Sequence, residues 1–88
     1  MSREKAERHI ACGDNVMEGT SILTTTGLQS GPEFAFYLYN SALGNYQKIN
    51  DIDGQRVALY RMISAAEAWG NNEMVVNCRK WLKELDDD

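Results

Sequence analysis

The chain has 88 residues, a formal net charge of −4 and 43% hydrophobic residues, a balance typical of one small globular domain. This composition argues against a disordered chain, and no stretch is long and apolar enough to indicate a signal peptide or a bilayer span. The nine basic residues are dispersed among 13 acidic ones, whereas direct binding to nucleic acid needs a basic stripe. We therefore expect a single cytoplasmic domain over residues 1–88 that binds neither nucleic acid nor membranes.

The first predicted element is a helix over residues 3–18, because apolar and charged positions occupy opposite arcs of a helical wheel. Gly19 is the expected stop for this helix. Residues 19–30 combine β-branched residues with turn formers and are predicted to form a loop. A connection of this length is long for a small helical domain, and long loops are often functional.

A second helix is predicted over residues 31–49. Its start signal is a capping box, with Ser30 as N-cap, Pro32 in the first turn and Glu33 three residues after the serine. The apolar positions fill an arc of about 200°, twice the stripe of about 100° that one buried face requires. Glu33 is also the only charged residue between Gly19 and Gln47. This helix is therefore expected either to run through the middle of the domain or to be covered by a partner.

A third helix is predicted over residues 54–69, after a short polar turn in which Asp51 or Asp53 can act as N-cap. Its apolar arc contains many small residues, which allow close approach of neighbouring helices. Gly70 is expected to end the helix in the left-handed conformation.

The last predicted helix covers residues 72–85, with Asn71 or Asn72 as its cap and a regular amphipathic pattern. Two short connections join the last three helices. These elements predict an all-α fold, a small four-helix up-down bundle.

Residues 55–71 offer an alternative architecture. Their alanines and the closing sequence Trp69-Gly70-Asn71 resemble the end of a helical hairpin in tetratricopeptide-like adaptors. The resemblance covers about a fifth of the chain and implies a tetratricopeptide-like hairpin.

Few residues are suited to catalysis or metal binding. His9 precedes Cys12 by three residues, a spacing that places the two side chains side by side on a helix, where they could form a nucleophilic pair. With Cys78 and Asp14 the same pair could complete a zinc site. Glycine-rich phosphate-binding motifs do not occur in the sequence. We expect the two cysteines to be reduced, buried core residues, and the protein to be no enzyme and to use no cofactor or metal.

The aromatic residues suggest a different role. Five of the eight lie between residues 34 and 46, where tyrosines offer large contact areas at small entropic cost. The sequence therefore predicts a non-enzymatic protein–protein interaction module that presents this helix and the loop to a partner protein or to a second copy in a homodimer. The expected contact residues are the anchors Tyr37, Tyr39 and Tyr46, the rim residues Asn40 and Asn45, and the loop residues Leu23 and Leu28.

An alternative is an acidic inhibitor of a nucleic-acid-binding enzyme that acts by charge mimicry, as in phage or mobile elements. Its carboxylates would be densest at Glu84, Asp86, Asp87 and Asp88. Salt separates the two hypotheses, because charge–charge attraction is screened beyond about 4 Å at about 0.5 M salt, whereas an aromatic interface is not.

Overall fold

The computed structural model describes residues 2–18 and 31–86, and this part of the chain is helical without any strand. The helices are α1 (Ser2–Glu18), α3 (Gly31–Lys48), α4 (Ile52–Trp69) and α5 (Asn72–Asp86). The predicted all-α fold is thus confirmed. The expected loop over residues 19–30, with the cap Ser30 and the contact residues Leu23 and Leu28, lies outside the described residues.

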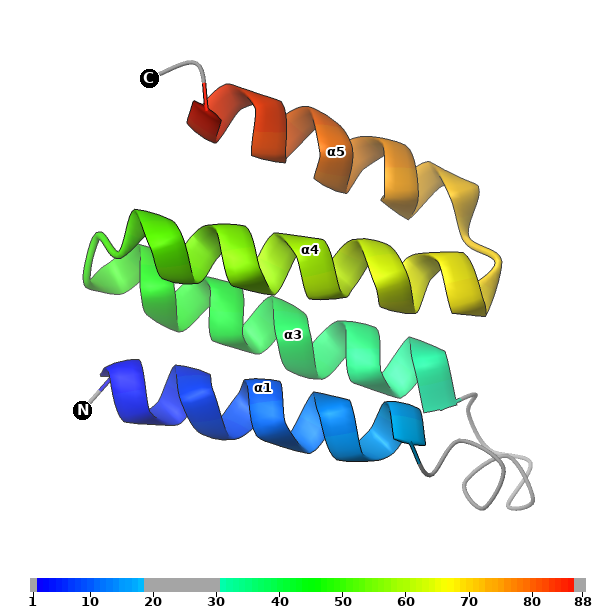
Figure 1. Ribbon diagram of the computed structural model, residues 1–88, viewed down its shortest axis with the longest axis horizontal. Helices are drawn as coiled ribbons and strands as arrows, with labels where there is room; N and C mark the ends of the chain where they lie inside the picture. The colour runs from blue at the N-terminus through cyan, green and yellow to red at the C-terminus, as the bar shows by residue number, and fades with distance from the viewer. Residues whose placement is uncertain (1, 19–30, 87–88) are drawn as a thin grey trace.

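The helices follow one another up and down and pack in chain order, α1 on α3, α3 on α4 and α4 on α5 (Figure 1). In this order α3 and α4 have a neighbour on both sides, whereas α1 and α5 are the outer helices. The wide apolar arc of α3 follows from this position, because a helix with two neighbours needs two contact faces.

The turn between α3 and α4 is closed by Asp51. Its Oδ1 accepts a hydrogen bond of 2.9 Å from the Gly54 amide, which makes Asp51 the N-cap and lets α4 begin two residues before the predicted start. Its Oδ2 accepts a hydrogen bond of 2.7 Å from Arg3, which ties the start of α1 to the turn. The Gly54 amide and, after it, Arg3 hold the pKa of Asp51 below its ordinary value.

The turn between α4 and α5 has the predicted signals. Gly70 has a φ of 83°, and its amide donates to the carbonyl of Ala66 at 2.9 Å. This left-handed conformation favours glycine. Asn71 then caps α5, since its Oδ1 accepts a hydrogen bond of 3.2 Å from the Met74 amide.

The core runs along the row of helices, with Leu43 of α3 and Leu59 of α4 as its largest fully buried side chains. α5 contributes only Val75 and Cys78 as buried residues, since among the described helices it packs chiefly on α4. The other buried hydrophobic residues are Ala6, Ile10, Ala35, Phe36, Tyr39, Ala42, Tyr46, Ala58, Met62, Ala65 and Ala66.

Two tyrosines of α3 set its distance from the neighbouring helices. The Tyr39 ring lies on Gly13 of α1, and the Tyr46 ring lies on Gly54 of α4. A Cβ atom at either glycine would overlap the ring opposite it. The glycines are therefore required by close packing, and each one makes room for a tyrosine of α3.

Candidate functional site

The first candidate site is the side of α3 that faces away from the core. We call it the outer face of α3 and define it by five exposed residues: Phe34, Tyr37, Asn40, Ser41 and Gln47. No charged residue occurs between Glu33 and Lys48, so this face is uncharged along almost the whole helix. Charge is depleted in the same way at the centres of protein–protein interfaces.

Tyr37 is the main aromatic residue of the outer face, and two neighbouring aromatic rings pack against its ring. It is 49% exposed. Its ring centroid lies 5.9 Å from that of Phe36 and 6.2 Å from that of Trp69, and these two rings lie 5.7 Å from each other. Such edge and tilted arrangements are favourable for aromatic pairs. A ring that is already ordered loses little entropy on binding.

The polar residues of α3 have mixed positions. Asn40 is exposed. Asn45 is half-buried, and its Nδ2 donates a hydrogen bond of 3.0 Å to the Ser41 carbonyl one turn earlier. Ser41 in turn donates to the Tyr37 carbonyl at 3.2 Å. The side-chain amide of Asn45 therefore already donates a hydrogen bond within α3, whereas the side chain of Asn40 is exposed to solvent.

Tyr39 and Tyr46, the other two expected anchors, lie in the core. They are 3% and 7% exposed and contact Gly13 and Gly54, as described above. Burial is the main reason why the pKa of Tyr46 is raised. In the described conformation neither ring offers appreciable surface to a partner, so Tyr37 is the one predicted anchor that does.

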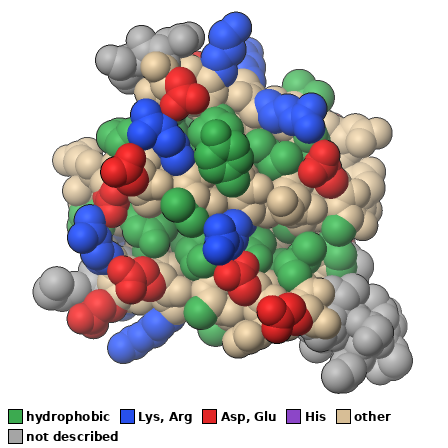
Figure 2. All heavy atoms as spheres, viewed as in Figure 1, with side chains coloured by type: hydrophobic (Ala, Val, Ile, Leu, Met, Phe, Trp, Pro, Cys, Tyr) green, Lys and Arg blue, Asp and Glu red, His purple; other side chains and the backbone are tan. Residues whose placement is uncertain are grey.

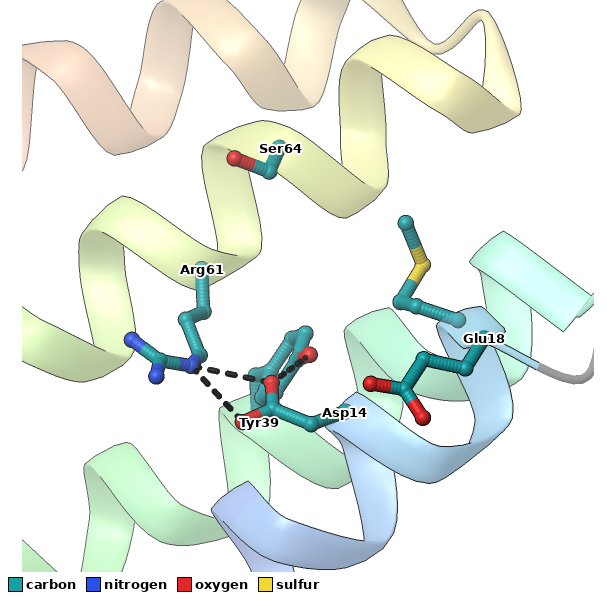
Figure 3. A pocket seen from close by; sticks show the side chains of 6 residues that line it. Asp14, Glu18, Tyr39, Arg61 and Ser64 are labelled. Atoms are coloured by element: carbon teal, nitrogen blue, oxygen red, sulfur yellow. Dashed lines mark hydrogen bonds and ion pairs between the residues drawn. The ribbon is translucent and has the colours of Figure 1, made fainter.

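The second candidate site is a polar network between α1, α3 and α4 (Figure 3). The Tyr39 hydroxyl donates to Asp14 Oδ1 at 2.5 Å, and Arg61 Nε donates to Oδ1 and Oδ2 of the same carboxylate at 2.9 and 3.3 Å. Burial, followed by the hydrogen bond to Asp14, raises the pKa of Tyr39 far above its ordinary value. The network joins three helices through one carboxylate.

This network borders an open pocket of about 450 Å³. It lies between α1 and α4 above the Tyr39 ring (Figure 3). Its lining residues are Asp14, Met17, Glu18, Tyr39, Arg61 and Ser64. Sequence reasoning missed this pocket, because Asp14, Tyr39 and Arg61 lie on three different helices and no motif connects them. The one signal in the sequence was Gly13. A glycine in the apolar arc of α1 indicates that a bulky side chain of a neighbouring helix packs against it.

Within the described residues the cysteines do not complete the zinc site considered from the sequence. Cys78 is buried, and burial raises the pKa of its thiol, which favours the unreactive neutral form. Cys12 is exposed, so the prediction that it is a core residue was wrong; the contacts of α1 with α3 follow Ala6, Ile10 and Gly13 instead. Cys12 and Cys78 lie on the two outer helices (Figure 1). Within residues 2–18 and 31–86 no three His, Cys, Asp or Glu side chains could hold a metal ion.

Acidic side chains do not gather into one dense patch. On the face shown in Figure 2 acidic and basic side chains are interspersed. At least five described carboxylates take part in ion pairs, and Asp86 is one of them, 2.8 Å from Arg56 Nε. The others are Asp14, Asp51, Asp53 and Glu67. Glu84 is exposed, and Asp87 and Asp88 lie outside the described residues.

Comparison with known proteins gave no match to any family model, curated protein or solved structure. The resemblance of residues 55–71 to tetratricopeptide-like hairpins therefore gains no support from these searches. Among the helices that the structure describes, none is long and apolar enough to cross a membrane.

Proposed function

We propose that the protein is a small, non-enzymatic cytoplasmic interaction module that binds a partner protein, or a second copy of itself, through the outer face of α3. One observation carries this proposal: an exposed face of α3 stays uncharged from Phe34 to Gln47, although a quarter of the chain is charged. A face with no role in contacts has no need to exclude charge, since charged residues on exposed helix faces favour solubility.

Tyr37 is the proposed anchor, and Phe34 enlarges the apolar area beside it. They are 49% and 42% exposed, and Tyr37 rests on the rings of Phe36 and Trp69. Aromatic residues in such positions supply a large share of the binding energy in protein interfaces. Asn40 is the proposed rim residue. Two free thiols, one of them exposed, are typical of a reducing compartment, which supports the assignment to the cytoplasm.

The test compares Tyr37→Glu with Tyr60→Glu. Tyr60 is the matched control, because it is similarly exposed (56%) but lies on α4, away from the outer face of α3. Light scattering measures self-association, and co-purification from the native cell measures binding of a partner. We expect Tyr37→Glu to abolish association and Tyr60→Glu to preserve it. A wild-type chain that is monomeric and retains no partner, or a Tyr37→Glu variant that associates normally, would remove the proposal.

Charge mimicry of a nucleic acid is the less favoured function. The ion pairs described above neutralise several of the carboxylates that such an inhibitor would present, including Asp86 in the acidic C-terminal segment. Repeating the association experiment at about 0.5 M salt separates the two functions, because screening shortens the reach of charges to about 4 Å. We expect association through Tyr37 to survive this change. Loss of association at high salt together with normal association of Tyr37→Glu would favour charge mimicry.

A further inference from the structure

The pocket between α1 and α4 has the features of a ligand site of its own. Its volume of about 450 Å³ falls within the range of about 300–1,000 Å³ that small-molecule sites occupy. It does not belong to the outer face of α3. Tyr39 forms its floor, whereas Tyr37, two positions away, points to the other side of the helix and is exposed.

The charge in the pocket is unbalanced. Asp14 and Glu18 stand one turn apart on α1, so their side chains share one face of the helix. Arg61 neutralises Asp14 through its Nε, but no described residue forms an ion pair with Glu18. Two carboxylates and one guanidinium leave the lining with a formal charge of −1. Glu18 carries this unbalanced charge, and a cation beside it would neutralise the lining.

The position of the pocket at the end of α1 also favours a cation. Glu18 is the last residue of α1, and the C-terminal end of a helix carries a partial negative charge that attracts cations. The last turn of α1 contains no basic residue. The helix therefore lacks, in its own sequence, the positive charge that its C-terminal end favours.

An anionic ligand fits the pocket poorly. Arg61 is the basic residue of the lining, and its Nε is already bonded to Asp14. In Figure 3 its terminal nitrogens point away from Glu18, whereas the Glu18 carboxylate points toward Asp14. An anion near Glu18 would meet two carboxylates and no free donor of Arg61.

The remaining lining residues suit the rest of a cationic ligand. The Ser64 hydroxyl can accept a hydrogen bond from an ammonium or guanidinium group. The Met17 side chain provides an apolar wall for methylene groups. Methionine adapts its shape to such chains easily.

We propose that this pocket binds a primary ammonium or guanidinium group carried on a short apolar chain, with Glu18 as its counter-ion and Met17 against its methylene groups. A free amine can supply this chemistry, and so can a lysine or arginine side chain on the surface of another protein. The proposal holds whether or not the outer face of α3 binds a partner.

The test is an NMR titration of protein labelled at the methionine methyl groups. n-Butylammonium chloride is the probe, and sodium butyrate at equal ionic strength is the control for chain length and salt. We expect a saturable shift of the Met17 signal with butylammonium and none with butyrate, while the signal of Met74 on α5 stays in place. The absence of a saturable Met17 shift, or an equal shift with butyrate, would overturn the proposal.

The variant Glu18→Gln tests the counter-ion, and Glu84→Gln on α5 is its matched control. Both residues are exposed, so neither change is expected to unfold the chain. We expect Glu18→Gln to weaken binding of butylammonium about fivefold, as for loss of a partly exposed ion pair, and Glu84→Gln to have no effect. Equal affinities of Glu18→Gln and wild type would contradict the assigned role.

A second titration separates the two sources of the cation. N-acetyl-lysine amide presents the ammonium group as a protein would, with the backbone attached. Binding of this compound at least as tight as that of butylammonium identifies a lysine side chain as the natural ligand class. Binding of butylammonium alone identifies a free amine.

Discussion

The two faces of α3 place the same residue type in opposite surroundings. On the inner face, Tyr39 and Tyr46 are almost fully buried, each against a glycine of a neighbouring helix. On the outer face, Tyr37 is half-exposed and rests on two other aromatic rings. The inner tyrosines determine how closely the helices approach one another, whereas the outer one is available for binding. The difference arises from what lies opposite each ring, and the amino-acid type does not reveal it.

The largest expected effect comes from removing a ring of the inner face. Tyr39→Ala and Tyr46→Ala should each lower the free energy of unfolding by about 3–5 kcal/mol, because they leave a large cavity in the core. That loss is a major part of the 5–15 kcal/mol that stabilises an ordinary domain. Tyr37→Ala should cost at most about 1 kcal/mol, since it loses only ring contacts at the surface. Urea denaturation followed by circular dichroism measures all three. Equal losses at positions 37 and 39 would contradict the distinction between the faces.

The glycines opposite the tyrosines provide the next test. Gly13→Ala and Gly54→Ala should destabilise the protein by about 1–3 kcal/mol, because the added methyl group overlaps a ring. Gly44→Ala is the matched control on α3 itself, where an added Cβ meets no atom within 4 Å. This change should stabilise the helix by about 0.5–1 kcal/mol.

Thermal denaturation of the three glycine variants measures these changes in stability. A gain in stability for Gly13→Ala or Gly54→Ala would mean that the tyrosines do not pack as described.

The inner face also predicts a loss of stability in alkali. The pKa values of Tyr39 and Tyr46 are raised in the folded protein, chiefly by burial. Above the ordinary value of 10.0 the unfolded chain releases these protons while the folded chain retains them. Their contribution is therefore complete below pH 10 and declines as the pH rises above it. Denaturation midpoints between pH 9 and pH 12 measure this decline, and Tyr39→Phe should reduce its slope.

The smallest expected effect concerns the turn that joins α3 to α4. Asp51→Ala removes the N-cap of α4 and should cost about 1 kcal/mol. Asp51→Asn retains a capping side chain but cannot ionise. The pKa of Asp51 is lowered in the folded protein, so its contribution is present above the ordinary value of 3.8 and is lost as the pH falls below it. Stability measured in acid should therefore decline less steeply for Asp51→Asn than for wild type.

These faces also mark the limit of what could be predicted from the sequence. Local signals were sufficient for the helices: Asp51, Gly70 and Asn71 occupy the cap positions that their residue types favour. The width of the apolar arc of residues 31–49 indicated a helix with more than one contact face. Periodicity could not show which neighbour covers each side, so it did not separate Tyr37 from Tyr39.

Contacts between distant parts of the chain were the other feature that could not be predicted. The bond between Asp14 and Tyr39 joins residues 25 positions apart, and that between Asp14 and Arg61 joins residues 47 apart. No spacing rule connects such positions. The prediction that Cys12 is buried was wrong because periodicity alone does not show how far a contact face extends. Cys12 lies at the edge of the apolar arc of α1, and only the centre of that arc packs on α3.

Site-specific photo-crosslinking tests the role of the outer face most directly. A benzoylphenylalanine residue is placed at position 37 in one variant and at position 60 in another, since both native tyrosines are exposed and lie on different helices. Irradiation in the native cell is followed by separation by mass. We expect a defined crosslinked product from position 37, with a second copy or with one partner, and none from position 60. Absence of a product at position 37, or equal crosslinking at both positions, would contradict it.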